Sequence, residues 1–146
     1  MDEPRDLTIL ALDAEFERGR LHLRGEGALA MIDVPDDHVN GDFLADRQSG
    51  FFAEANYTFL TRPWLGLEKT SFIAFTRYDG IDLNVGSFEG TSGDIGDTVK
   101  RVTTGVAFRP TPDTVFRLSY FREWQDDAFN NRVNLMNVQF GAATYF

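Results

Sequence analysis

Hydrophobic and polar side chains alternate with a period of two along most of this chain of 146 residues. Alternation of this kind is typical of β-strands whose two faces meet different surroundings. The fourteen phenylalanines, four tyrosines and two tryptophans also favour strands. The sequence therefore predicts an all-β protein with seven amphipathic strands. The segments are 10–16, 21–29, 51–59, 70–79, 101–109, 115–120 and 136–146.

The two faces of these segments differ in charge. One face is apolar and carries no charged residue, as in the series Leu10, Leu12, Ala14 and Phe16. The opposite face carries the acidic and basic side chains. They are Asp13, Glu15, Arg24, Glu26, Glu54, Arg77, Asp79, Arg101, Arg109 and Arg117. The pattern predicts an antiparallel sheet with one apolar and one wet face.

The links between the segments alternate in length. The links 18–20, 61–66 and 110–113 are short, whereas 33–48, 84–98 and 125–131 are long. In an up-and-down meander all short links fall on one rim and all long links on the other. No repeat with a period of 20–50 residues and no second domain is visible, so residues 1–146 are expected to form a single domain or the C-terminal part of one.

Composition excludes several function classes. The chain has no cysteine, so it has no disulfide or thiolate metal site, and its net charge of −9 argues against nucleic-acid binding. The longest apolar run, 28–32, is far below the ~20 residues of a spanning helix, but barrel strands need only ~10. The charged start Met1–Asp6 shows no signal peptide. The chain is thus expected to be cytoplasmic, already processed, or a piece of a longer protein.

Alternation alone does not say whether the apolar face meets a soluble core or lipid. Three features favour lipid. Aromatic residues gather near the rim with the short links, as at a membrane interface. Short links on one rim and long loops on the other match outer-membrane barrels, and the strand pattern continues to the last residue. The aromatic residues are Phe16, Phe59, Trp64, Phe108, Phe116 and Phe146.

The last eight residues, Gln139-Phe140-Gly141-Ala142-Ala143-Thr144-Tyr145-Phe146, resemble the C-terminal assembly signal of bacterial outer-membrane proteins. That signal has a terminal Phe and apolar residues at every second position before it, which corresponds here to Phe146, Thr144, Ala142, Phe140 and Val138. The chain departs from it by placing Tyr145 next to last rather than third from last. The resemblance implies assembly by the barrel assembly machinery and a location among the lipids and lipopolysaccharide of a Gram-negative outer membrane.

Three further stretches, 72–79, 102–109 and 110–120, resemble a group of porins related to phosphate-selective porins. In that group a strand of the form P-F-x-R-Y-E precedes a strand–proline turn–strand hairpin and the closing strand. Ala74 stands where the group often has proline, and Asp79 where it has glutamate. The resemblance covers most of the chain from about Ser49 onward. It implies a transmembrane up-and-down barrel, passive diffusion of small polar or ionic solutes without a cofactor, and a homotrimer.

Seven strands also bear on the size of the barrel. Single-chain bacterial barrels have even strand numbers, and those that conduct solutes have more than eight strands. We therefore expect this chain to be the C-terminal part of a larger porin, with further strands upstream of Met1 or in another copy.

If the apolar face meets lipid, the charged face lines a lumen. The predicted pore-lining residues are Arg24, Glu26, Glu54, Arg77, Asp79, Arg101, Arg109 and Arg117. Arg77, Arg101 and Arg117 are expected to matter most, because they lie inside the strands. Arginines separated from carboxylates would set a field that selects ions. The alternative is that the charges pair along neighbouring strands and keep the lumen wet.

No catalytic constellation is visible. His22 and Glu26 share a face, with Ser71 or Ser119 elsewhere on the sheet, but nothing in the sequence connects them. The acidic segment 33–48 lacks the calcium-loop pattern and is interpreted as solvated surface, and the glycines between 86 and 96 match no phosphate-binding loop. We therefore expect no enzyme, no metal and no cofactor.

Two alternatives to a porin stay open. One is a soluble lipocalin-like barrel that binds an apolar ligand in its interior. The other is an outer-membrane adhesin or anchor, in which the loops carry the function and the lumen is plugged.

Overall fold

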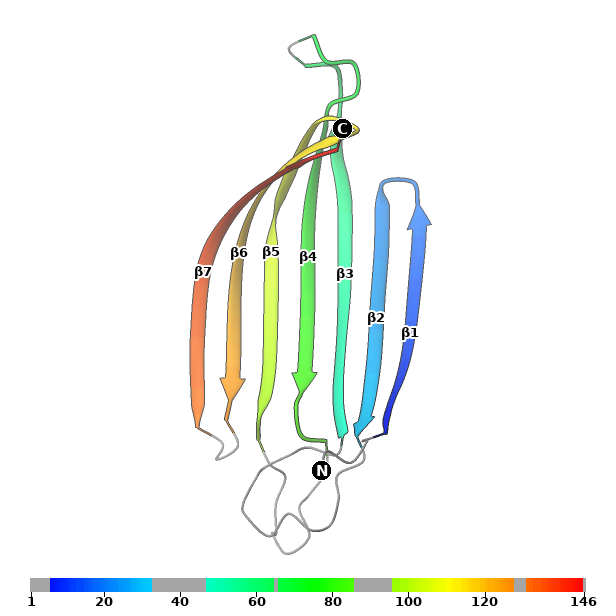
Figure 1. The fold of residues 1–146 in the computed structure, drawn as a ribbon. Coiled ribbons are helices and arrows are strands. Elements are labelled where there is room, and N and C mark those ends of the chain that lie inside the picture. Colours follow the sequence, from blue (N-terminus) through cyan, green and yellow to red (C-terminus); the bar gives the residue numbers. More distant parts are fainter. Residues whose placement is uncertain (1–5, 33–46, 65, 86–95, 128–130, 146) are drawn as a thin grey trace, which may run out of the picture.

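The seven predicted strands are present and form one antiparallel sheet. The structure, a computed structural model, describes residues 6–32, 47–64, 66–85, 96–127 and 131–145. The sheet runs in chain order from the first strand to the last, which confirms the all-β, up-and-down prediction (Figure 1). The strands are β1 (Leu7–Arg18), β2 (Leu21–Ile32), β3 (Arg47–Thr61), β4 (Ser71–Asp82), β5 (Thr98–Thr111), β6 (Thr114–Asp126) and β7 (Arg132–Thr144).

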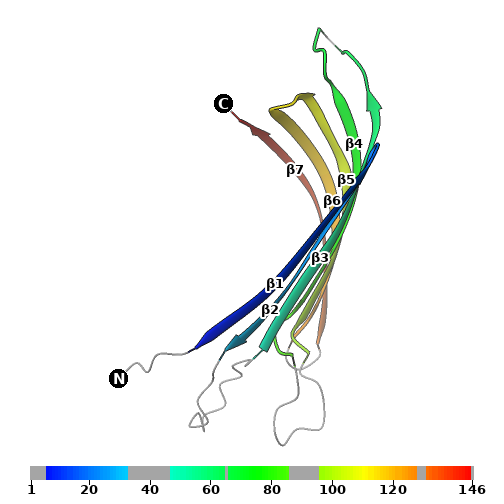
Figure 2. The same cartoon turned by 90° about the vertical axis from the view of Figure 1, so that its right-hand side faces the viewer.

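The sheet is twisted and curved, and it is open (Figure 2). Within the described residues, β1 pairs only with β2 and β7 pairs only with β6, so the sheet does not close into a barrel. Because seven strands alternate in direction, β1 and β7 run the same way along the sheet. In the described part of the chain, no helix has the length and apolarity that a membrane crossing requires.

The connections alternate between the two rims, but their lengths do not separate as predicted, because 62–70 at one rim is longer than 127–131 at the other. At one rim Gly19, with a φ of 62°, turns β1 into β2, and Pro112 and Asp113 turn β5 into β6. The third connection on this rim spans 62–70, longer than predicted, and is held by backbone hydrogen bonds between Trp64 and Leu67 of 2.9 and 3.1 Å. We call this rim the turn rim. At the opposite rim, which we call the loop rim, β2 leads to β3, β4 to β5 and β6 to β7 (Figure 1).

Burial on the two faces is the reverse of that in a water-soluble sheet. On the charged face Glu54 is 5% exposed and Glu123 only 2% exposed. On the apolar face Leu118 is 49% exposed and Phe140 71% exposed. The described residues contain only two buried hydrophobic side chains, Phe75 and Ala107, and both lie on the charged face. Side chains therefore crowd together on the charged face, which is the concave one, and spread apart on the apolar face.

The apolar face is not free of charge along its whole length. The strands extend beyond the predicted segments, and near the loop rim this extension places Lys100 and Arg122 on the apolar face. The guanidinium of Arg122 lies 5.1 Å from the ring centroid of Trp124 on the same face. Long cationic side chains near the end of an apolar surface can extend their charged ends toward water.

Candidate functional site

Strand register gathers all eight predicted pore-lining residues on one face of the sheet. Glu54 of β3 lies opposite Arg24 of β2 on one side and Arg77 of β4 on the other. Two residues along β4 on the same face, Asp79 lies opposite Arg101 of β5. This face also carries Glu26, Arg109 and Arg117. Each of them lies an even number of positions along its strand from another residue of the face, and side chains at even spacing share one face.

Glu54 is the most connected residue of this face. Its Oε1 accepts hydrogen bonds from Nε of Arg24 at 3.0 Å and from Nδ2 of Asn56 at 2.8 Å. Its Oε2 is buried and has no hydrogen-bond partner, and Nη2 of Arg117 lies 3.8 Å from it. The Glu54 side chain is only 3% exposed, so its negative charge depends on these neighbours rather than on water.

Two further ion pairs continue the pattern across the sheet. Nε of Arg77 donates to Oδ1 of Asp79 at 2.7 Å, and Arg101 pairs with the buried carboxylate of Glu123. Sequence analysis missed Glu123, which lies beyond the predicted segment 115–120. Phe121 on the charged face and Arg122 on the apolar face interrupt the alternation just before Glu123, so the polarity pattern does not reveal it.

The arginines of this face lie on phenylalanine rings. The guanidinium carbon of Arg77 is 3.9 Å from the ring centroid of Phe52, and that of Arg117 is 3.6 Å from the ring centroid of Phe75. Arg101 lies over Phe121 in the same way at 4.9 Å. A planar guanidinium can stack on a ring and still direct its edge toward a carboxylate. The stack of Arg117 accounts for Phe75, an apolar residue on the charged face of segment 70–79.

Most charged side chains in the middle of this face form ion pairs. The unpaired acidic side chains lie on different strands from the unpaired arginine. Arg77, Arg101 and Arg117 each lie within 4 Å of a carboxylate oxygen. Among the described residues, Asp13, Glu17 and Glu26 on β1 and β2 have no ion-pair partner, and neither has Arg109 on β5. For Arg77, Arg101 and Arg117, the pairing alternative considered in the sequence analysis is therefore the one observed.

A hollow of about 400 Å³ opens on the charged face and is lined from six strands, β1 to β6. Its floor includes Phe75 and Ala107, the two buried hydrophobic residues. A hollow of this size is in the range of small-molecule sites. Its titratable lining is Glu17, His22, Arg24, Glu54, Arg109 and Arg117.

The apolar face carries a belt of aromatic rings near the turn rim. Neighbouring ring centroids in this belt are 4.8 to 6.5 Å apart, from β3 across to β7. Four of its members were predicted, whereas Phe72 and Phe140 were not. Phe16 lies on the same face near the turn end of β1, and Phe146 is outside the described residues. The aromatic belt consists of Phe59, Trp64, Phe72, Phe108, Phe116 and Phe140.

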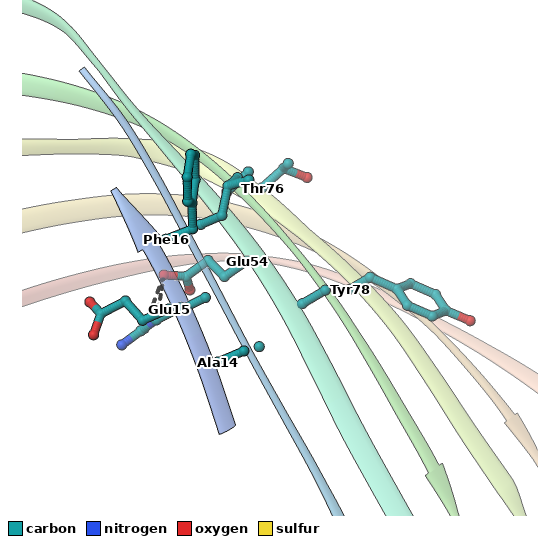
Figure 3. A pocket seen from close by; sticks show the side chains of 11 residues that line it. Ala14, Glu15, Phe16, Glu54, Thr76 and Tyr78 are labelled. Atoms are coloured by element: carbon teal, nitrogen blue, oxygen red, sulfur yellow. Dashed lines mark hydrogen bonds and ion pairs between the residues drawn. The ribbon is translucent and has the colours of Figure 1, made fainter. Parts of the chain in front are cut away.

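A second hollow, of about 530 Å³, indents the apolar face between β1 and β4 (Figure 3). It forms where side chains are small, at Gly25, Ala53 and Ala55. In Figure 3 the carboxylates of Glu15 and Glu54 point to one side of the sheet and the ring of Tyr78 points to the other. The hollow is thus part of the apolar surface and is separate from the charged one.

The remaining expectations concern catalysis and metals. Nε2 of His22 lies 2.5 Å from Oε1 of Glu15, whereas Ser119 is on β6, four strands away from β2. No group of three or more His, Asp or Glu side chains in the described ranges is placed to hold a metal ion. Most of the acidic segment 33–48 lies outside the described residues.

Comparison with known proteins identifies no relative of this chain. No family model, no curated protein and no solved structure matches the chain.

Proposed function

We propose that this chain forms part of an antiparallel transmembrane β-barrel in a bacterial outer membrane, and that the barrel is a porin-like channel for passive diffusion of small polar or ionic solutes. The observation that carries the proposal is the reversed burial of the sheet. Glu54 and Glu123 are almost fully buried on the concave face, while Leu118 and Phe140 are exposed on the convex face. That is the arrangement expected of a sheet with water inside and lipid outside.

The energetics of the apolar face support a lipid environment. Removing a Leu, Val or Phe side chain from water contributes roughly 1.5–3 kcal/mol. Val106, Leu118 and Val138 are each about half exposed or more, and they belong to a continuous apolar surface. Continuous exposed apolar surface of this kind marks an interface with protein or membrane. Acyl chains would cover all of it without needing a shaped partner.

The height of the apolar surface also fits a bilayer. The aromatic belt bounds it at the turn rim, and Tyr78 and Trp124 lie on the same face toward the loop rim. From Phe116 to Trp124 a strand rises roughly 26 Å at about 3.3 Å per residue. With a strand tilt of about 40° the vertical height is roughly 20 Å, close to the ~25 Å apolar band of outer-membrane barrels.

The charged face is suited to a water-filled lumen. Its ion pairs and ring stacks hold the arginine forks against the wall, and its unpaired carboxylates and Arg109 face the open side. Fixed charges of both signs orient polar solutes and select among ions. A lipocalin-like barrel would need the apolar face inside, which is the opposite of the observed burial.

The lipid environment is tested by tryptophan quenching. The full chain is folded into vesicles of phosphatidylcholine that carries bromine near the headgroup. Two variants are used: Trp64→Phe keeps only Trp124, and Trp124→Phe keeps only Trp64. Both remaining tryptophans are expected to be quenched, because Trp64 and Trp124 lie near the two ends of the apolar band. A chain that folds as a monomer in plain buffer and shows no quenching would overturn the proposal.

Channel activity is tested separately in planar bilayers. The closed barrel to which this chain contributes, completed by further strands or further copies, is expected to conduct, and Arg117→Glu in it is expected to shift the reversal potential toward cation selectivity. A closed, membrane-inserted barrel that does not conduct would instead support an adhesin or anchor. The same holds if charge reversal at Arg77 and Arg117 changes neither its conductance nor its reversal potential.

A further inference from the structure

We propose that the hollow on the charged face is a binding site for a small organic monoanion with an apolar body. The carboxylate of such a solute binds between Arg109 and Arg117, and its apolar body rests on the partly exposed Ile73 and Val115, beside the buried Phe75. The proposal deepens the channel function, on which it rests, by naming the class of solute that the lumen would retain.

The two arginines are neighbours on adjacent strands. Arg117 of β6 lies directly opposite Ala107 of β5, and Arg109 is two residues further along β5 on the same face. Both side chains line the hollow. Diagonal neighbours at this spacing are within reach of each other through long side chains. Two guanidinium groups can therefore donate to the two oxygens of one carboxylate.

Within the described ranges, neither arginine donates a side-chain hydrogen bond. Arg109 is exposed and has no ion-pair partner among the described residues. Arg117 approaches Oε2 of Glu54 only to 3.8 Å, which is too long for a hydrogen bond. That oxygen is buried and has no hydrogen-bond partner, so Glu54 does not take up the N–H groups of Arg117. The stack on Phe75, at 3.6 Å, holds the Arg117 guanidinium in place without occupying its N–H groups.

The floor beside the arginines is apolar. Ile73, Phe75, Ala107 and Val115 line the hollow together, although they lie on the face that carries the charges. Phe75 and Ala107 are buried. An apolar patch next to two donors matches an amphiphilic solute, with its charged end on the arginines and its body on the floor.

The carboxylates of the hollow discriminate against dianions. Glu17 and Glu54 line the same space, so a second negative charge on the solute would be placed near them, and Arg24, the third arginine of the hollow, is already paired with Glu54. Like-charge placement of this kind is unfavourable and gives specificity. The geometry therefore favours an aromatic monocarboxylate over phosphate.

The test measures binding by calorimetry on the full chain folded in detergent micelles. Benzoate is the probe, and benzyl alcohol, acetate and phosphate are the comparators. Benzoate is expected to bind tightest, because benzyl alcohol lacks the charge, acetate lacks the body and phosphate lacks the body and carries up to two charges. Arg109→Gln is expected to weaken benzoate binding about tenfold or more, as for other hydrogen bonds to charged groups.

Arg109→Gln is the main variant because Arg109 has no ion-pair partner in the described part of the chain, so its loss should leave the sheet folded. Arg122→Gln is the matched control: it removes an arginine from the opposite face of β6, and benzoate affinity should not change. Arg117→Lys keeps the charge but loses the planar fork, so it is expected to bind benzoate more weakly than the wild type and more tightly than Arg117→Gln.

Phosphate binding equal to benzoate binding, or unchanged affinity in Arg109→Gln, would overturn this proposal. The outcome is separable from that of the channel proposal. If benzoate binds in micelles but no conductance is measured in bilayers, the binding-site proposal stands and the channel proposal is wrong. If conductance is measured but benzoate does not bind, the channel proposal stands and the binding-site proposal is wrong.

Discussion

At the scale of single residues, Glu54 determines how the charged face is organised. One carboxylate receives Arg24 and Asn56 on Oε1 and faces Arg117 with Oε2. Arg24 and Arg117 are each more than 40% exposed, so only the glutamate itself is deeply buried. A buried carboxylate surrounded by half-exposed arginines is stable only while its partners stay in place.

Removing this charge should therefore loosen the sheet. Glu54→Gln is expected to lower the free energy of unfolding by about 1–3 kcal/mol, less than for a fully buried pair because solvent screens the arginines. Urea unfolding in micelles, followed by circular dichroism, measures the change. Glu26→Gln is the control, since Glu26 is exposed and has no ion-pair partner among the described residues. Equal effects of the two variants would contradict the role given to Glu54.

Gly105 is the second residue on which the charged face depends. A Cβ at this position would lie 2.7 Å from Cζ of Phe75 and 2.2 Å from the carbonyl oxygen of Leu118. Gly105→Ala is thus expected to displace the Phe75 ring and the β5–β6 pairing, with a loss of about 1–3 kcal/mol of stability. Gly141→Ala, where the new Cβ meets nothing within 4 Å, is the control in the same unfolding measurement. A Gly105→Ala protein as stable as the control would show that this close approach relaxes without cost.

At the scale of the strands, the sequence was sufficient for the order and direction of all seven. Period two and link length are local properties, and they do not depend on tertiary contacts. Strand ends were predicted less well, because polar residues near the loop rim such as Glu123 hide the alternation. The stacking of Arg117 on Phe75 was beyond reach, since it joins residues of different strands. The eight charged residues could be assigned to one face, but which of them are paired depends on side-chain geometry.

The two faces of a strand should respond differently to a new charge. Leu118→Arg places a cation on the apolar face, where a lipid environment raises its cost to about 2–4 kcal/mol near the bilayer midplane. Thr103→Arg places the same cation on the charged face and should change stability by less than about 1 kcal/mol. Folding yield into vesicles and urea unfolding compare the two variants. The reverse order of stability would mean that water, not lipid, covers the apolar face.

At the scale of the whole molecule, the sheet leaves two long edges exposed. Every residue of β1 and of β7 is classed as exposed, in contrast to the crowded middle strands. An edge strand offers unpaired backbone groups to any neighbour. In hydrocarbon such groups must be paired, so a membrane-inserted form of this sheet has to close.

Hydrogen exchange distinguishes the open from the closed form. In micelles the open sheet is expected to exchange the amides of β1 and β7 much faster than those of β4 and β5, because one side of each edge strand is unpaired. Closure by additional strands or copies would bring the edge amides to the same slow exchange as the centre. Slow exchange throughout in a chain shown to be monomeric would mean that β1 and β7 pair with each other.

The shared direction of β1 and β7 limits what can complete the ring. Suppose that the additional strands pair with β1 and with β7 in the antiparallel sense. The first and the last additional strand must then both run opposite to β1 and β7, so the number of additional strands is odd. The total is then even, which is the parity of single-chain bacterial barrels. A second identical sheet in the same orientation would instead meet the first along two parallel seams.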